Sequence, residues 1–203
     1  MNTASQIDTT VLIVGGGPVG MTMALCLAKH GIPSYLVELR SAETLPDVKC
    51  NHISSRSMEL FRSLGISQDL RAAGLPDNYP HDVSYRTTTL GEEIARIHIP
   101  GRNTRLTDHS GPDGNWPTPE PPHRINQRYI EPILRRHVQK QTLITCLYRH
   151  QVLAFTQDTN QVTAQIQNLD QPDSQALTLS AAYMVGCDGG RSMVRKGIGA
   201  KLV

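Results

Sequence analysis

The sequence lacks a strong charge of one sign, closely spaced cysteines and internal repeats. Its 203 residues carry a net charge of +2, so we expect neither nucleic acid nor an anionic membrane as a partner. Cys26, Cys50, Cys146 and Cys187 are widely scattered and form no Cys-x-x-Cys or Cys/His cluster. Because zinc sites are built from such clusters, no metal is expected, and reduced cytoplasmic thiols are the simplest interpretation.

The sequence also lacks a clear membrane segment. Residues 9–28 carry no charge, and the run approaches the length of about 20 residues that a bilayer-spanning helix needs. Three consecutive glycines and a proline interrupt it, however, and no lysine or arginine precedes it as in a signal peptide. We therefore expect a cytoplasmic protein without membrane contact.

What the sequence does have is a strand–loop–helix–strand pattern near its start. Residues 10–14 form a short, β-branched apolar run that is typical of a buried parallel strand. A Gly-Gly-Gly-Pro-Val-Gly loop follows, then a helical stretch over residues 21–30, and then a second strand over residues 34–38. This is the β-α-β context that a dinucleotide-binding G-x-G-x-x-G loop requires.

The residues of this pattern have distinct expected roles. Gly15 allows the tight turn, Gly17 lets the backbone approach a pyrophosphate, and Gly20 lets the helix pack closely on the strand. Glu38 ends the second strand, where its carboxylate can accept hydrogen bonds from ribose hydroxyls and repel a 2′-phosphate. The loop therefore favours FAD or NAD over NADP. The alternative is a glycine-rich turn beside a solvent-exposed glutamate.

The middle of the chain predicts helices, strands and one long loop. Apolar residues recur at helical spacing in three segments, residues 51–65, 67–74 and 124–141. Residues 83–86 and 94–99 are typical of strands. Residues 103–122 are rich in Pro, Gly, Asp and Thr, which predicts a surface loop of unusual length.

Near the end, three strand-like segments lead into a second glycine-rich loop. They cover residues 143–153, 161–167 and 175–184, and turn-like breaks between them predict a small β-meander. Residues 186–190 (Gly-Cys-Asp-Gly-Gly) then interrupt the apolar run. The glycines permit backbone N–H groups to face an anion, and Asp188 can accept hydrogen bonds from ribitol or ribose hydroxyls. The alternative is a plain strand–turn–helix.

Four segments in this order resemble the N-terminal part of the single-component, FAD-dependent aromatic hydroxylases, the para-hydroxybenzoate hydroxylase and phenol hydroxylase-like monooxygenases. The segments are VLIVGGGPVGMTMALCLAKHGIPSYLVELR, KCNHISSRSMELFRSLGI, HRINQRYIEPIL and YMVGCDGGRSMVR. The resemblance runs nearly end to end. It implies an α/β fold, namely a Rossmann-like FAD-binding domain with a β-α-β start and a small β-meander.

The resemblance also implies which residues contact the cofactor. The pyrophosphate would be held by Gly15, Gly17, Pro18 and Gly20. Glu38 would hold the adenosine ribose, with Arg40 near the same end unless it is a solvated loop residue. Lys49 stands where the family often has an arginine near the FAD phosphates, so the charge is kept but the guanidinium fork is lost.

Three further contacts follow from the resemblance. Arg56 lies on the helix that faces the cofactor in the family, although it could be a solvated helix residue. Gln127 and Asp188 would contact the middle of the cofactor. The family's catalytic acid and base residues lie largely in the part that has no counterpart here or in a variable region, so none is assigned.

The resemblance implies a parent protein that is a flavin-dependent monooxygenase. It would use non-covalent FAD, with NAD(P)H as co-substrate, to insert one oxygen atom from O2 into an aromatic, phenolic small molecule. The full-length parent could be a homo-oligomer. The alternatives are an FAD- or NAD-linked dehydrogenase or reductase of the same fold, and a non-catalytic nucleotide-binding fragment.

The chain departs from the family in length. The family's third FAD motif, a Gly-Asp segment followed by Ala-His, has no counterpart here, and neither does most of the substrate sheet. We therefore expect residues 1–203 to form an FAD-binding domain that is incomplete at its C-terminus. Residues 76–123 would be an excursion towards a largely missing substrate domain.

Overall fold

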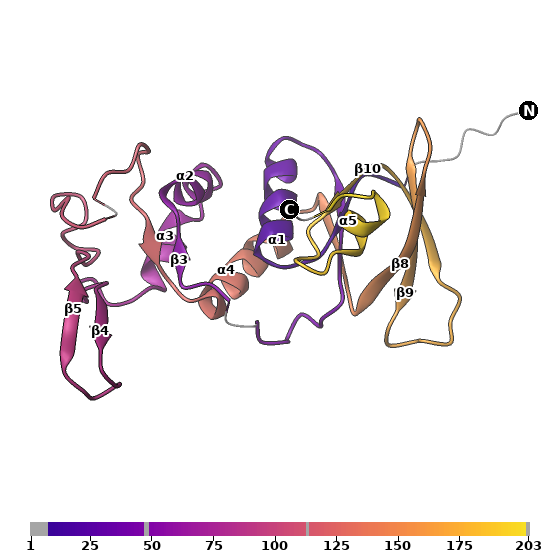
Figure 1. Ribbon diagram of the computed structural model, residues 1–203. Helices are drawn as coiled ribbons and strands as arrows, with labels where there is room; N and C mark the ends of the chain where they lie inside the picture. The colour runs from indigo at the N-terminus through magenta and orange to yellow at the C-terminus, as the bar shows by residue number, and fades with distance from the viewer. Residues whose placement is uncertain (1–7, 47–48, 113, 202–203) are drawn as a thin grey trace, which may run out of the picture. The chain divides into compact units, whose positions relative to one another are not determined.

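The computed structural model describes residues 8–46, 49–112 and 114–201 (Figure 1). The chain divides into two compact units, the first within residues 1–45 and 134–203 and the second within residues 46–133. The division falls inside one helix, α4 (Gln127–Gln139), which starts three residues later than the helix expected from residue 124.

A six-stranded mixed sheet forms the centre of the first unit, with the strand order β7-β2-β1-β10-β9-β8. The strands are β1 (Thr9–Val14), β2 (Ser34–Glu38), β7 (Ile144–Tyr148), β8 (His150–Gln157), β9 (Val162–Asn168) and β10 (Leu177–Gly186). β1 pairs in parallel with β2 and β10, and β2 pairs in parallel with β7. β8, β9 and β10 pair antiparallel, and the ribbons of β8 and β9 lie side by side in Figure 1. The predicted β-α-β start and β-meander are both confirmed.

Apolar side chains explain why these segments form the sheet. Leu12, Ile13 and Leu36 have no exposed surface, as expected for parallel strands that are covered on both faces. Burying one such side chain contributes about 1.5–3 kcal/mol to folding. The uncharged segment 9–28 forms β1, the glycine loop and most of helix α1 (Pro18–Lys29). Within the described ranges, no helix is long and apolar enough to cross a membrane.

The prediction of a single strand over residues 143–153 is wrong. Two strands occupy this segment, and they pair with different neighbours: β7 runs parallel to β2, whereas β8 runs antiparallel to β9. Arg149 separates them with a φ of 55°, a left-handed conformation that is uncommon for a residue other than glycine. Its N–H donates to the carbonyl oxygen of Arg40 at 3.2 Å. A pattern of apolar residues does not reveal that one residue, Arg149, separates two strands.

The second unit contains short helices and two small antiparallel sheets. Its elements before α4 are β3 (His52–Ile53), α2 (Ser55–Ser63), α3 (Ser67–Ala72), β4 (Val83–Arg86), β5 (Glu93–Ile97) and β6 (His123–Arg124). β3 pairs with β6 and β4 pairs with β5. The hydroxyl of Ser54 accepts from the backbone N–H of Ser57 and caps α2, which begins inside the helical segment expected over residues 51–65.

The long segment between β5 and β6 matches the expected surface loop only in part. Its described residues form turns and bends, as predicted. However, Arg105 and Glu120 are buried, with exposed fractions of 4% and 7%. The guanidinium of Arg105 lies 5.0 Å from the ring centroid of Trp116, which in turn stacks on His109. The segment therefore carries packed, charged side chains: Arg105 packs on Trp116 within the segment, whereas Glu120 pairs with the distant Arg71.

Candidate functional site

Three chain segments meet at one edge of the first unit's sheet. β1, β2 and β10 are parallel neighbours, so their carboxyl ends, at Val14, Glu38 and Gly186, lie on the same edge. The N–H of Gly15 donates to the Val37 carbonyl at 2.8 Å, and the N–H of Cys187 donates to the Val14 carbonyl at 2.7 Å. In open α/β sheets this edge is where ligands bind.

Two glycines of the first loop are required by the protein's own packing. Gly15 has a φ of +106°, and a Cβ there would lie 2.4 Å from the carbonyl oxygen of Cys187. A Cβ on Gly20 would lie 1.8 Å from the carbonyl oxygen of Gly15. Both neighbours are backbone atoms, which a side chain cannot push aside cheaply. These positions therefore hold the loop, β10 and α1 in close contact.

Gly17 differs from these two glycines because a Cβ there would meet nothing within 4 Å. Gly17 is the N-cap of α1, Pro18 occupies the first helical turn, and neither a capping side chain nor an acidic residue is found there. The first N–H groups of a helix have no partner within the helix, and the helix dipole favours an anion at this end. The open space and the uncapped end fit a phosphate group.

Glu38 lies beside the loop and is 8% exposed. Its Oε2 accepts from the N–H of Gly16 at 2.6 Å, and its Oε1 accepts from both the backbone N–H and Nε of Arg40 at 2.9 Å. A Cβ on Gly16 would lie 2.8 Å from the Cβ of Glu38. Sequence reasoning assigned no role to Gly16, although a third glycine inside G-x-G-x-x-G was a visible sign of close approach.

Asp188 holds the second loop in place. Its Oδ2 accepts from the backbone N–H groups of Met193 and Val194, at 2.6 and 3.4 Å, and so fixes the start of the short helix α5 (Met193–Gly197). Its Oδ1 is buried and has no hydrogen-bond partner among the described residues. Because a buried carboxylate oxygen without a partner is costly, this atom suits a ligand hydroxyl.

Two further groups at this edge were not anticipated. Tyr148 ends β7 directly opposite Glu38 in the sheet register, and burial raises the pKa of its phenol to about 12. The guanidinium of Arg135 lies 6.0 Å from the Tyr148 ring centroid. Burial, with the Asp188 carboxylate beside it, also raises the pKa of the Cys187 thiol, so this cysteine is neutral at pH 7. The sign available for Tyr148 was an aromatic residue at the end of a strand, and for Cys187 it was the position inside the second glycine-rich loop.

The remaining predicted contacts belong to the second unit. Lys49 is exposed. Arg56 has a side chain that is 84% exposed and forms an ion pair with Glu59 one helical turn along. Gln127 donates from Nε2 to Oε1 of the buried Glu131 at 2.7 Å. The structure thus brings together the glycine loop, Glu38, Arg40 and Asp188 in the first unit. The other three predicted contacts lie in the second unit.

The edge of the first unit has the donor and acceptor set of an FAD site. Its uncapped helix end can take phosphates, its glutamate can accept from ribose hydroxyls, and the unpartnered oxygen of Asp188 can accept from another hydroxyl. Across the described ranges, no three His, Cys, Asp or Glu side chains are grouped as a metal site would require. The residues present therefore fit a dinucleotide.

Comparisons with known proteins agree with this geometry. The chain is 30% identical over 203 residues to phenol 2-monooxygenase from Pseudomonas sp. (strain EST1001), covering 99% of this chain and 32% of that protein. It is 29% identical to 2,4-dichlorophenol 6-monooxygenase from Cupriavidus pinatubonensis (strain JMP 134 / LMG 1197), covering 94% and 31%. The chain thus spans about a third of the length of these relatives.

Solved structures give the same result. The rebeccamycin biosynthetic enzyme RebC with reduced flavin matches with a TM-score of 0.81 and 34% identity, over 96% of this chain and 35% of that one. The flavin-dependent monooxygenase PieE in complex with FAD and substrate matches with a TM-score of 0.80 and 29% identity, over 96% and 33%. The family described as FAD binding domain matches residues 8–203, which include the glycine loop, Glu38 and the Asp188 loop. The chain therefore belongs to the family of FAD-binding domains.

Proposed function

We propose that this chain is the FAD-binding part of a flavin-dependent monooxygenase that hydroxylates an aromatic, phenolic substrate with O2 and NAD(P)H. The observation that carries the proposal is the convergence of the glycine loop, Glu38 and Asp188 at one sheet edge. Relatives named as phenol and dichlorophenol monooxygenases support the reaction class. Bound FAD would supply the chemistry with O2, and the protein would bind and orient it.

Each residue at the edge has a proposed part in cofactor binding. The loop from Gly15 to Gly20 and the N-terminus of α1 would accommodate the pyrophosphate, because N–H groups and the helix dipole point there. Glu38 would accept from the adenosine ribose, and its bond to Gly16 would keep the loop in position. Arg40, held against Glu38, would lie at the adenosine end. Asp188 would accept a hydroxyl through Oδ1.

The assignments in the second unit rest on the family resemblance. Lys49 and Arg56 are proposed as cationic contacts to the cofactor, and Gln127 as a contact to its ribityl chain. Glu131 limits the motion of the Gln127 amide, which would favour a defined contact. Single alanine substitutions at these three positions, each followed by an FAD titration, test the assignments one by one.

The proposed reaction is tested with the intact protein, meaning the whole product of its gene. It is expected to purify yellow, to release FAD on acid denaturation, and to consume O2 and NAD(P)H in step with a hydroxylated phenol. A protein that oxidises NAD(P)H without hydroxylating any phenol in a broad panel would support the dehydrogenase or reductase alternative. A colourless protein that cannot be reconstituted with FAD would contradict the cofactor assignment.

Three finer properties are proposed with their own measurements. Parallel assays with NADH and NADPH decide which nicotinamide is the co-substrate. Light scattering after gel filtration decides whether the intact protein is a homo-oligomer. Fractionation of the source cells tests the proposed cytoplasmic location.

A further inference from the structure

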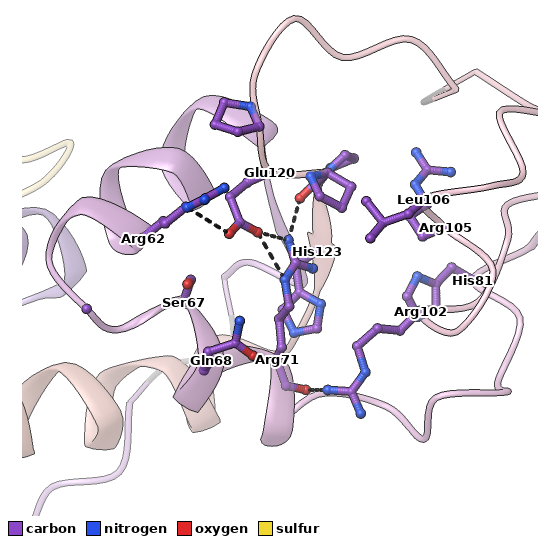
Figure 2. A pocket seen from close by; sticks show the side chains of 14 residues that line it. Arg62, Ser67, Gln68, Arg71, His81, Arg102, Arg105, Leu106, Glu120 and His123 are labelled. Atoms are coloured by element: carbon purple, nitrogen blue, oxygen red, sulfur yellow. Dashed lines mark hydrogen bonds and ion pairs between the residues drawn. The ribbon is translucent and has the colours of Figure 1, made fainter.

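The second unit contains an arginine-rich cavity that none of the proposed cofactor contacts line. Its volume is about 570 Å³, which is within the range of about 300–1,000 Å³ that is typical of small-molecule sites. Figure 2 shows arginine side chains approaching it from several segments. The charged lining residues are Arg62, Arg71, Arg102, Arg105 and Glu120.

The electrostatics of this cavity favour an anion. Four arginines and one glutamate line it, and the carboxylate of Asp77 pairs with one of these arginines from outside the lining, so the arginines outnumber the carboxylates. Two histidines in the lining do not add to this charge. Burial lowers the pKa of His123 to about 4. A hydrogen bond to the Leu70 carbonyl opposes this shift, and the nearby charges of Arg71 and Arg102 add to it. Burial and the charges of Arg124 and Arg105 also lower the pKa of His81.

One side of the cavity already holds a carboxylate. Glu120 Oε2 accepts from Arg71 Nε at 3.2 Å and from Arg71 Nη2 at 2.5 Å. Arg62 approaches the other oxygen, with Nε 4.0 Å from Oε1 (Figure 2). Arg62 is more than half exposed and its contact to Glu120 is long, so its guanidinium can turn towards a second anion.

The other side of the cavity is formed by the long loop. Arg102 donates to the carbonyl oxygen of Arg71 and pairs with Asp77, which does not line the cavity. Arg105 is held over the ring of Trp116. These contacts restrain both guanidinium groups before any ligand arrives, which reduces the entropy cost of binding. The apolar part of the cavity wall is formed by Leu106, Pro119, Pro121 and Pro122.

We propose that this cavity binds a small organic acid, with its carboxylate on the arginines and its apolar body against Leu106 and the prolines. Guanidinium groups bind carboxylates through planar, charge-assisted hydrogen bonds. The apolar wall would add nothing to the binding of a bare inorganic anion, so an acid with a carbon skeleton is favoured over free phosphate. This site lies beyond the proposed FAD function and does not depend on it.

The first test is calorimetric titration of the intact protein with benzoate, benzamide and inorganic phosphate. Benzoate should bind, whereas benzamide, which has the same shape without the charge, should bind at least tenfold more weakly. Arg62→Ala should weaken benzoate binding at least tenfold. Arg128→Ala removes the same charge from an exposed position of α4 outside the cavity and should leave it unchanged.

A second variant tests the site in the opposite direction. Glu120→Gln removes the internal carboxylate that competes for Arg71 and Arg62, so benzoate should bind several-fold more tightly. Three results would overturn the proposal: no benzoate binding to the intact protein, equal benzoate affinity in Arg62→Ala, or phosphate binding as tightly as benzoate. The flavin absorbance of the same samples reports FAD binding separately, so a failure of the cofactor assignment is distinguished from a failure of this site.

Discussion

The two units of the chain differ in how many charged side chains they bury. The core around the β-meander in the first unit is built from aliphatic residues such as Leu12, Val37 and Ile166. Of the charged side chains that are buried in the described ranges, Arg105, Glu120 and Glu131 lie in the second unit and Glu38 alone lies in the first. Both units bury apolar side chains, but the second also depends on a charged pair between distant segments, Arg71 and Glu120.

The largest expected effect is a loss of close packing in the first unit. Gly20→Ala places a Cβ 1.8 Å from the carbonyl oxygen of Gly15, and relief requires α1 to move away from the loop. We expect a loss of about 4 kcal/mol in unfolding free energy, measured by chemical denaturation. Gly17→Ala is the matched control. It meets no atom within 4 Å and should cost less than about 1 kcal/mol. Equal losses in both variants would contradict the packing role of Gly20.

The second effect concerns the charged pair of the second unit. Arg71→Ala leaves the buried carboxylate of Glu120 without its main partner. Removing one member of a buried pair costs about 3 kcal/mol. Hydrogen exchange should show the lost protection in residues 49–133, whereas Gly20→Ala should lower protection in β1 and α1. Uniform loss of protection after either change would show that the two units do not differ in what stabilises them.

The third effect is on cofactor affinity rather than folding. Glu38→Ala removes the acceptor proposed for the ribose, together with the bond to the Gly16 N–H. We expect FAD to bind about 30-fold more weakly, which corresponds to about 2 kcal/mol for charge-assisted hydrogen bonds. Glu43→Ala, at an exposed position of the same unit, is the control. The titration follows quenching of flavin fluorescence, and an unchanged affinity would remove Glu38 from the ribose role.

The smallest effect is a pH dependence from the second unit. The pKa of His123 lies at about 4 in the folded protein, below the usual value of 6.5. Because the unfolded chain binds this proton more readily, the contribution of His123 to the unfolding free energy is fully present above pH 6.5 and is lost as the pH falls towards 4. Between pH 6.5 and pH 5 the loss is about 1.5 kcal/mol. His123→Gln should flatten this part of the stability profile in urea titrations. An unchanged profile would mean that His123 titrates normally.

The same contrast explains what could be predicted from the sequence. β1, β2 and α1 follow from apolar runs and glycines, because strand burial and loop geometry depend on residues close together in the chain. The break at Arg149 was missed because a single residue carries it. Arg71 and Glu120 are 49 positions apart, so no local pattern could pair them or reveal the cavity that they line.

The central claim is that the edge formed by the glycine loop, Glu38 and Asp188 binds FAD. The most direct test is to strip the intact protein of bound nucleotide and titrate it with FAD and, separately, with NAD, for the natural sequence and for Asp188→Asn. We predict one FAD per chain, much weaker binding of NAD, and a clear loss of FAD affinity in Asp188→Asn, because the amide nitrogen or oxygen replaces a charged acceptor. NAD binding more tightly than FAD, or FAD binding that is unaffected by Asp188→Asn and Glu38→Ala together, would contradict the claim.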